Sequence, residues 1–162
     1  MTNNDVIRSL SFTLELSNQK LAEIFKLGGK EVPLASVELF FKDEEDPTYL
    51  RCDDFVMSHF LDGLIYFKRG KDESRPPQPF EIPLSNNLIL KKLRVVFELK
   101  EPDMHEVIEK GGYSVGRSEL SAFFRKKGQP NYRECGDQVL RYFLKGLTVK
   151  FGRGYKPDAK KV

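Results

Sequence analysis

The stretch YLRCDDFVMSHFLDGL (49–64) and the later stretch YRECGDQVLRYFLKGL (132–147) decide the fold of this 162-residue chain. Overlaid with an offset of 83 residues and no gap, they belong to a longer internal match between residues 3–70 and 86–153. Of the 68 paired positions 20 are identical, and many others pair one apolar residue with another. Self-similarity at a fixed spacing is typical of a repeat architecture, so the chain is interpreted as two copies of one unit of roughly 70 residues.

Both stretches carry apolar residues at positions i, i+1, i+4, i+5 and i+8, the spacing of one face of an α-helix. These residues are Val56, Met57, Phe60, Leu61 and Leu64 in the first copy, and Val139, Leu140, Phe143, Leu144 and Leu147 in the second. A glycine lies within each stripe, at Gly63 and Gly146, where it costs about 1 kcal/mol relative to alanine. We interpret both glycines as points of close approach by another helix.

Three shorter helices are predicted ahead of this long one in each copy. The first follows an asparagine in the N-cap position, Asn4 or Asn87. The second ends at a glycine pair, residues 28–29 or 111–112, because glycine adopts the left-handed conformation that closes a helix. No alternating β-branched run indicates a strand. The predicted fold class is therefore all-α, as two tandem copies of a four-helix unit packed with pseudo-two-fold symmetry.

The expected organisation has four parts. Residues 1–70 form the first helical repeat and residues 86–153 the second. Residues 71–85, KDESRPPQPFEIPLS, hold four prolines and form an extended connector between the copies. Residues 154–162 form a basic C-terminal tail.

Composition narrows the class of protein. No apolar run approaches the roughly 18 residues that span a bilayer, and the N-terminus lacks a secretion-signal pattern, so a cytoplasmic protein is expected with no membrane partner. Two cysteines do not make a disulfide scaffold, and two histidines do not make a histidine metal cage.

The net charge of +3 hides an asymmetry: residues 1–83 carry 10 Lys and Arg against 15 Asp and Glu, and residues 84–162 carry 17 against 9. The second half can therefore attract a polyanion, or the first half of another copy.

A duplicated active site would keep its polar groups in both copies. The duplicated asparagines are attributed to helix capping, and the duplicated glutamates (Glu15, Glu98, Glu23 and Glu106) to the solvated outer faces of helices. What remains is a Tyr-x-x-Cys-x-Asp pattern at the start of each long helix, formed by Tyr49, Cys52 and Asp54 and by Tyr132, Cys135 and Asp137.

Two interpretations fit this pattern. A thiol at a helix N-terminus gains acidity, so the pair of Cys and Asp positions is a candidate nucleophile or metal site. Alternatively Cys packs as a small apolar residue, Asp meets the free N–H groups of the first turn, and Tyr clamps the preceding turn. The structural interpretation is favoured, because no general base is duplicated beside the cysteine. No catalytic residue, cofactor or metal ligand is predicted.

The second copy contains a basic cluster. Residues 103–128 have a loosely helix-turn-helix-like layout, and basic residues follow it along the last long helix. The candidate anion-binding residues are Arg117, Arg125, Lys126, Lys127, Arg141, Lys145, Lys150 and Arg153. Groups of this kind bind phosphates by releasing counterions without reading sequence.

Three hypotheses for function follow, and the sequence leaves them open. The first is a non-enzymatic binding module whose basic second half meets nucleic acid or an acidic protein surface. The second is a self-associating module that pairs its acidic and basic halves. The third, a cysteine-dependent enzyme or metal site, is the most remote. Phosphate-loop, dinucleotide and Ser-His-Asp signatures are absent.

Three long strings carry a resemblance to a known family: FLDGLIYFKRGKDES (60–74), NNLILKKLRVVFELK (86–100) and YRECGDQVLRYFLKGL (132–147). In this order they resemble the YehS-like family of bacterial proteins, whose domain of unknown function occurs twice per chain. The resemblance covers nearly the whole sequence. It implies a bacterial cytoplasmic protein made of two helical units, and it implies no reaction, cofactor or catalytic residue.

Overall fold

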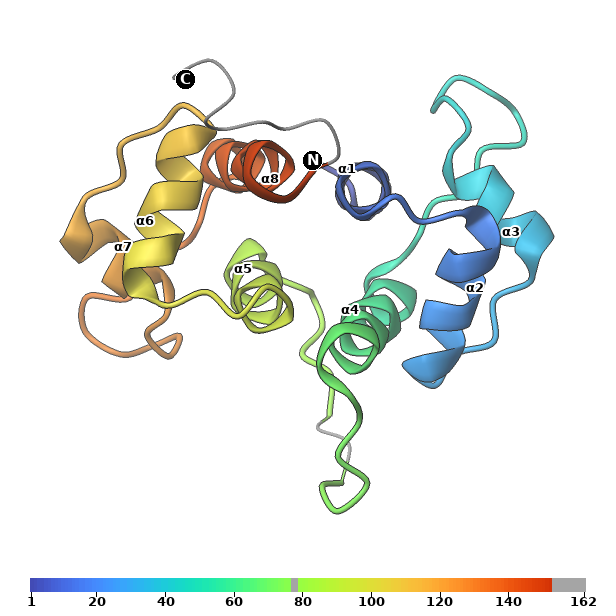
Figure 1. Cartoon of the computed structure of the whole chain (residues 1–162), viewed down its shortest axis with the longest axis horizontal. Helices are drawn as coiled ribbons and strands as arrows, with labels where there is room; N and C mark the ends of the chain where they lie inside the picture. The colour runs from blue at the N-terminus through green and yellow to red at the C-terminus, as the bar shows by residue number, and fades with distance from the viewer. Residues whose placement is uncertain (77–78, 153–162) are drawn as a thin grey trace, which may run out of the picture.

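The computed structural model describes residues 1–76 and 79–152, and this part of the chain is helical with no β-strand (Figure 1). The helices are α1 (Asn3–Leu14), α2 (Asn18–Leu27), α3 (Leu34–Phe40), α4 (Asp54–Arg69), α5 (Asn86–Val96), α6 (Glu101–Lys110), α7 (Arg117–Phe123) and α8 (Asp137–Phe151). The first four helices and the last four match pairwise at the offset of 83 residues. The predicted all-α class and tandem four-helix units are confirmed.

The two copies exchange their first helices. Helix α1 of the first copy packs on α8 of the second, and α5 of the second copy packs on α4 of the first. Inside each copy the second helix packs on the long helix, as α2 on α4 and α6 on α8. Figure 1 shows α1, α4, α5 and α8 in the middle of the molecule, with α2 and α3 on one side and α6 and α7 on the other. This reciprocal arrangement is the predicted pseudo-two-fold symmetry.

The apolar stripes of both copies form one continuous core. Phe60 of α4 and Phe143 of α8 are fully buried within the same cluster, at equivalent places in the two copies. Phe25 packs on Phe60 with 5.1 Å between ring centroids. A unit of about 70 residues is near the lower limit for an independent core, so sharing one core compensates for small size.

Two glycines meet where the second and fourth helices cross. A Cβ added to Gly63 would overlap the carbonyl oxygen of Ile24, and a Cβ added to Gly28 would overlap that of His59. The same overlaps occur in the second copy, at Gly146 and Gly111. The backbones of the two helices therefore lie in direct contact, which confirms the interpretation of Gly63 and Gly146 as points of close approach.

The second glycine of each pair closes the helix. Gly29 has φ of 98° and Gly112 has φ of 112°, in the left-handed region that favours glycine. The end of helix two was thus predicted for the right reason, although the two glycines of a pair differ in role: the first allows contact and the second allows the turn.

The prediction for the duplicated glutamates of helix one is partly wrong. Glu15 and Glu98 do not lie on the helix face but just past its end, each with φ of 53°. Their side chains are exposed, as expected, and Glu98 forms an ion pair with Arg69 at the end of α4. The same strained conformation in both copies shows that the turn between helices one and two is part of the repeat.

Candidate functional site

The duplicated asparagines do not cap helix one, which corrects the prediction. The N-cap residues are Thr2 and Ser85, whose side chains accept from the backbone N–H groups of Asp5 and Leu88. Asn4 lies inside the first turn and is buried.

Asn4 acts as a clamp on the loop between α3 and α4. Its Nδ2 donates to the carbonyls of Phe40 (3.0 Å) and Leu50 (2.9 Å), and its Oδ1 accepts from the N–H of Cys52 (2.9 Å). In the second copy Asn87 makes the equivalent three bonds, to Phe123, Arg133 and Cys135. An amide side chain supplies both donors and an acceptor to backbone groups that would otherwise be buried without partners.

The duplicated aspartates join the two copies. Asp54 does not bond the free N–H groups of its own helix, as the structural interpretation assumed. Its Oδ1 accepts from Asn3 (2.9 Å) and its Oδ2 from the N–H of Leu84, which precedes α5 (3.0 Å).

Asp137 repeats this arrangement with one difference. It accepts from Asn86 (2.8 Å) and from the terminal ammonium group of Met1 (2.7 Å), where Met1 is the counterpart of Leu84. These bonds, led by that to the ammonium group, hold the pKa of Asp137 below its usual range. Each aspartate therefore fastens the start of the other copy onto its own long helix.

The duplicated thiols are buried. Cys52 is 1% exposed and Cys135 is 4% exposed. Burial first, and then neighbouring carboxylates, raise the pKa of each thiol to about 12. A nucleophilic cysteine needs the opposite shift, because the thiolate is the reactive form. The structure thus supports the packing role of the cysteines and not the candidate nucleophile.

The remaining chemistry of the described residues is limited. Within residues 1–76 and 79–152, no three His, Cys, Asp or Glu side chains lie together in a way that would hold a metal ion. None of the helices described there combines the length and apolar character needed to cross a membrane.

The candidate anion-binding residues fall into separate groups. Arg117 and Arg125 flank α7, and Lys126 and Lys127 continue into the exposed loop after it. Arg141 and Lys145 are exposed on α8. Lys150 is half-buried and lies 3.3 Å from Glu106, so it is already paired. Arg153 lies outside the described residues.

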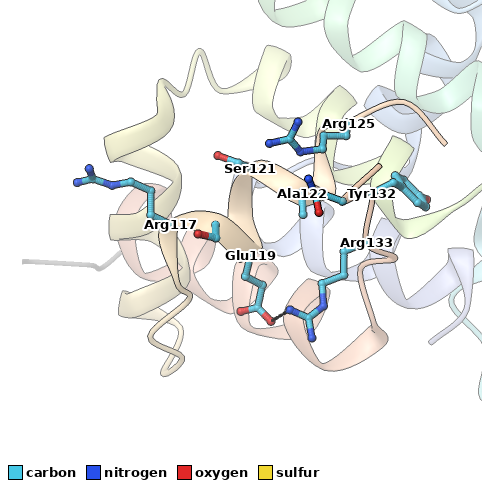
Figure 2. A pocket seen from close by; sticks show the side chains of 9 residues that line it. Arg117, Glu119, Ser121, Ala122, Arg125, Tyr132 and Arg133 are labelled. Carbon is cyan, nitrogen blue, oxygen red and sulfur yellow. Dashed lines mark ion pairs between the residues drawn. The ribbon is translucent and has the colours of Figure 1, made fainter. Parts of the chain in front are cut away.

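Helix α7 and the loop that returns beside it line an open hollow of about 730 Å³ (Figure 2). Its lining residues are Arg117, Ser118, Glu119, Ser121, Ala122, Arg125, Asn131, Tyr132 and Arg133. Sequence reasoning had grouped Tyr132 with the cysteine pattern and missed Arg133. The overlay held a signal for Arg133, since its counterpart is the apolar Leu50.

One carboxylate lies in the hollow and is already engaged. Glu119 accepts from the hydroxyl of Tyr113 (2.9 Å) and lies 3.8 Å from the guanidinium of Arg133. The bond to Glu119 is the main cause that raises the pKa of Tyr113. Figure 2 shows Arg133 turned toward Glu119, Arg125 extended beside Ser121, and Arg117 projecting from the start of α7.

Two arginines of the hollow keep their charge uncompensated. In the part of the chain that the structure describes, no carboxylate lies within ion-pair distance of Arg117 or Arg125. Two unpaired guanidinium groups beside serine and asparagine side chains are suited to bind phosphate oxygens.

Comparison with known proteins places the chain in a family. The family described as "Protein of unknown function (DUF1456)" matches twice, over residues 3–70 and 86–154. A relative from Escherichia coli (strain K12), "Uncharacterized protein YehS", is 41% identical over 150 residues, which cover 93% of this chain and 96% of the relative. No solved structure matches. The two family segments coincide with the two sets of four helices, and the chain belongs to the DUF1456 family.

Proposed function

We propose that the protein is a non-enzymatic binding module that holds a phosphate-bearing polyanion, such as single-stranded nucleic acid, on the outer face of its second copy. The observation that carries this proposal is the hollow around α7, where Arg117 and Arg125 have no acidic partner among the described residues and Arg133 adds a third guanidinium.

The spacing of these groups suits a chain of phosphates. Arg117 begins α7 and Arg125 follows its end, so the two arginines lie at opposite ends of a seven-residue helix that is roughly 10 Å long. Successive phosphates of one nucleic-acid strand rise by about 3.4 Å in a duplex and reach further when the strand is extended, so both arginines fall within a few nucleotides. Lys126 and Lys127 lie exposed beyond Arg125 and extend the same basic path.

Recognition through this surface is of the backbone and not of base edges. The helix-turn-helix-like segment corresponds to α6, the glycine turn and α7, but α7 has only seven residues. A recognition helix reads a major groove with several side chains along its length, whereas here the charges lie at the helix ends and in the loop. Phosphate contacts of this kind position a ligand without reading its sequence.

Titration of a labelled single-stranded 20-nucleotide DNA, followed by fluorescence anisotropy at about 50 and 200 mM salt, tests the proposal. Arg125→Glu, Lys126→Glu and Lys127→Glu, combined in one variant, replace exposed cations of the path. We expect this variant to lose measurable binding and the wild type to weaken steeply with salt, by about 0.7 in the logarithmic slope for each phosphate contact.

A matched control separates the surface from net charge alone. Lys26→Glu, Lys42→Glu and Lys68→Glu, combined in one variant, produce the same change in charge on exposed positions of the first copy, and Lys42 is the counterpart of Arg125. This control should bind nearly as well as the wild type. Absence of binding by the wild type at low salt, or an equal loss in the control, would rule the proposal out.

The second candidate is self-association of the two unlike faces. At the place of the basic loop, the first copy carries Asp43, Glu44, Glu45 and Asp46, and no ion pair engages them among the described residues. This exposed acidic loop is complementary in charge to the hollow of another molecule.

Sedimentation velocity at rising salt tests this alternative, because screening of exposed charges should dissociate the assembly. Two variants, each with loops of one charge sign only, make the test sharper. The loop variant at 125–127 and its converse, Asp43→Lys with Glu44→Lys and Glu45→Lys, should each be monomeric alone and should associate when mixed. A mass that does not change with salt removes the alternative.

A further inference from the structure

The exposed face between α1 and α8 carries the most exposed large apolar side chain among the described residues. Phe12 of α1 is 73% exposed. Its helix runs parallel to α8, because Met1 reaches Asp137 at one end of the pair and Thr13 bonds Thr148 (2.6 Å) at the other. An aromatic ring this open to solvent at a helix pair is a candidate contact for a partner.

The pseudo-two-fold symmetry supplies a covered counterpart of this face, between α4 and α5. There the chain's own connector lies across α4, with Phe80 against Phe55 (5.8 Å between ring centroids) and His59 (4.7 Å). A cavity of about 330 Å³ remains beside Phe80, and Val95, the counterpart of Phe12, lines it. The molecule therefore shows what covers such a face: an extended segment, Pro79-Phe80-Glu81, with its aromatic ring inward.

The two faces differ in charge. On the covered face Asp62 pairs with Lys92 (2.7 Å), so the pair neutralises itself. On the open face Lys145 takes the place of Asp62, and Ser9 takes the place of Lys92. No acidic partner of Lys145 occurs among the described residues. The open face therefore has an uncompensated cation where the covered face has an ion pair.

Two further replacements complete the open face. Arg141 replaces the buried Ser58 and is exposed beside Asp137, whose carboxylate the ammonium group of Met1 and Asn86 already hold. Tyr142 takes the place of His59, stacked on Tyr113 at 5.5 Å. Of the two rings that hold Phe80 in the other copy, His59 therefore has an aromatic counterpart, whereas Gln138 replaces Phe55 and donates to the Tyr142 hydroxyl (3.1 Å). Two cations, Arg141 and Lys145, lie on the same helix beside Tyr142.

We propose that Phe12, Arg141, Tyr142 and Lys145 form a docking face for an extended acidic peptide of a partner protein. The partner's aromatic side chain lies on Tyr142, as Phe80 lies on His59, and reaches toward Phe12, the counterpart of the cavity-lining Val95. Its carboxylates pair with Arg141 and Lys145. This face is separate from the hollow around α7 and does not depend on polyanion binding there.

The probe is a fluorescein-labelled peptide, PPQPFEEPL, which is the connector sequence 76–84 with Ile82→Glu to add a second carboxylate. Anisotropy titration against the full chain should show saturable binding. Arg141→Glu with Lys145→Glu should weaken it about tenfold, as the loss of two exposed ion pairs implies. Phe12→Ser, and the peptide carrying Phe80→Ala, should each weaken it by a similar factor, because each removes one side of an aromatic contact.

Arg125→Glu with Lys126→Glu is the control, since it makes the same change in charge at the hollow; it should leave peptide binding unchanged. Three outcomes overturn the proposal. One is no saturable binding. Another is binding that the α1 and α8 variants leave intact, which would mean that the peptide displaces the connector from α4. The third is binding that a single-stranded oligonucleotide competes for and that Phe80→Ala in the peptide does not weaken, which would assign the face to nucleic acid.

Discussion

The outer faces of the two copies have the same backbone and opposite surfaces. Around α7 the second copy presents Arg117, Arg125 and Arg133. At the matching places around α3 the first copy presents Leu34, Lys42 and Leu50, and both leucines are exposed. The loop that follows is basic in one copy and acidic in the other. The fold therefore does not require either set of side chains.

The inner residues behave in the opposite way. Gly63 and Gly146, Asn4 and Asn87, and Cys52 and Cys135 are identical pairs in identical surroundings. The glycines meet a neighbouring carbonyl, the asparagines bond the backbone of a distant loop, and the cysteines are buried. The charged positions that differ most between the copies, such as Asp43 against Lys126, are exposed to solvent, and those are the positions where function is proposed. The predictions below test this contrast at matched places.

The largest effect is expected at the helix crossings. Gly63→Ala and Gly146→Ala each drive a methyl group into a carbonyl of the second helix, and we expect each to lower the free energy of unfolding by about 3 kcal/mol. Urea denaturation followed by circular dichroism measures it. Gly136→Ala is the control, because a Cβ there would lie in open space, and it should cost about 1 kcal/mol at most. A tolerated Gly63→Ala would contradict the contact.

The asparagine clamps should matter nearly as much, and equally in both copies. Asn4→Ala and Asn87→Ala each leave two buried carbonyls and one N–H without partners, at an expected cost of about 2 kcal/mol. The same denaturation experiment applies. A loss of stability for only one of the two variants would contradict the equivalence of the two clamps that their hydrogen bonds indicate.

Because the two thiols are buried, we expect the protein to lose stability in alkali. The folded pKa of each, about 12, lies above the value of an unfolded thiol. Their stabilising contribution is therefore complete below pH about 8.5 and is lost as the pH rises through the folded pKa, at up to about 1.4 kcal/mol per pH unit for each thiol. Denaturation from pH 8 to 11 measures the slope, and a variant with Cys52→Ala and Cys135→Ala should reduce it. Rapid reaction of native thiols with a chromogenic disulfide at pH 8 would contradict their burial.

A graft tests whether the arginines alone distinguish the outer faces. Leu34→Arg with Leu50→Arg rebuilds the arginine pattern of the second copy around Lys42 of the first. We expect about fivefold tighter binding of the labelled oligonucleotide at low salt, limited by the acidic loop nearby. Leu34→Gln with Leu50→Gln is the control that removes the apolar side chains without adding charge. An equal gain in that control would show that the arginines are not responsible.

The smallest effect concerns the one difference between the duplicated aspartates. Because Asp137 has a lowered pKa, its ion pair with the ammonium group of Met1 stabilises the fold above pH about 4 and is lost as the pH falls through the lowered value. Asp137→Asn should cost less than about 1 kcal/mol at pH 7, since the side chain is 47% exposed and screened by solvent. Stability measured at low and high salt checks this, because only the wild type should respond at that site.

Much of the fold was predictable because the chain contains its own comparison. Apolar positions that persist through an offset of 83 residues must face an interior, and their spacing identifies the helices. The same overlay identified the glycines of the crossings, since glycine inside a long helix is destabilising unless a neighbour requires it.

The tertiary structure alone decided which copy each helix packs against. Helix one could pack on the long helix of either copy with the same stripe, because the two long helices carry equivalent residues. In the structure it packs on the long helix of the other copy, and the aspartate bonds to Leu84 and Met1 join the same partners. The asparagines were assigned to capping for a similar reason: their true partners, the carbonyls of Phe40 and Leu50, are distant in sequence. Arg133 was missed because a hollow is formed by a returning loop, and no local spacing encodes the path of a loop. Local physical chemistry therefore determined the helices of this protein, and only the packing of distant segments decided its pairings and surfaces.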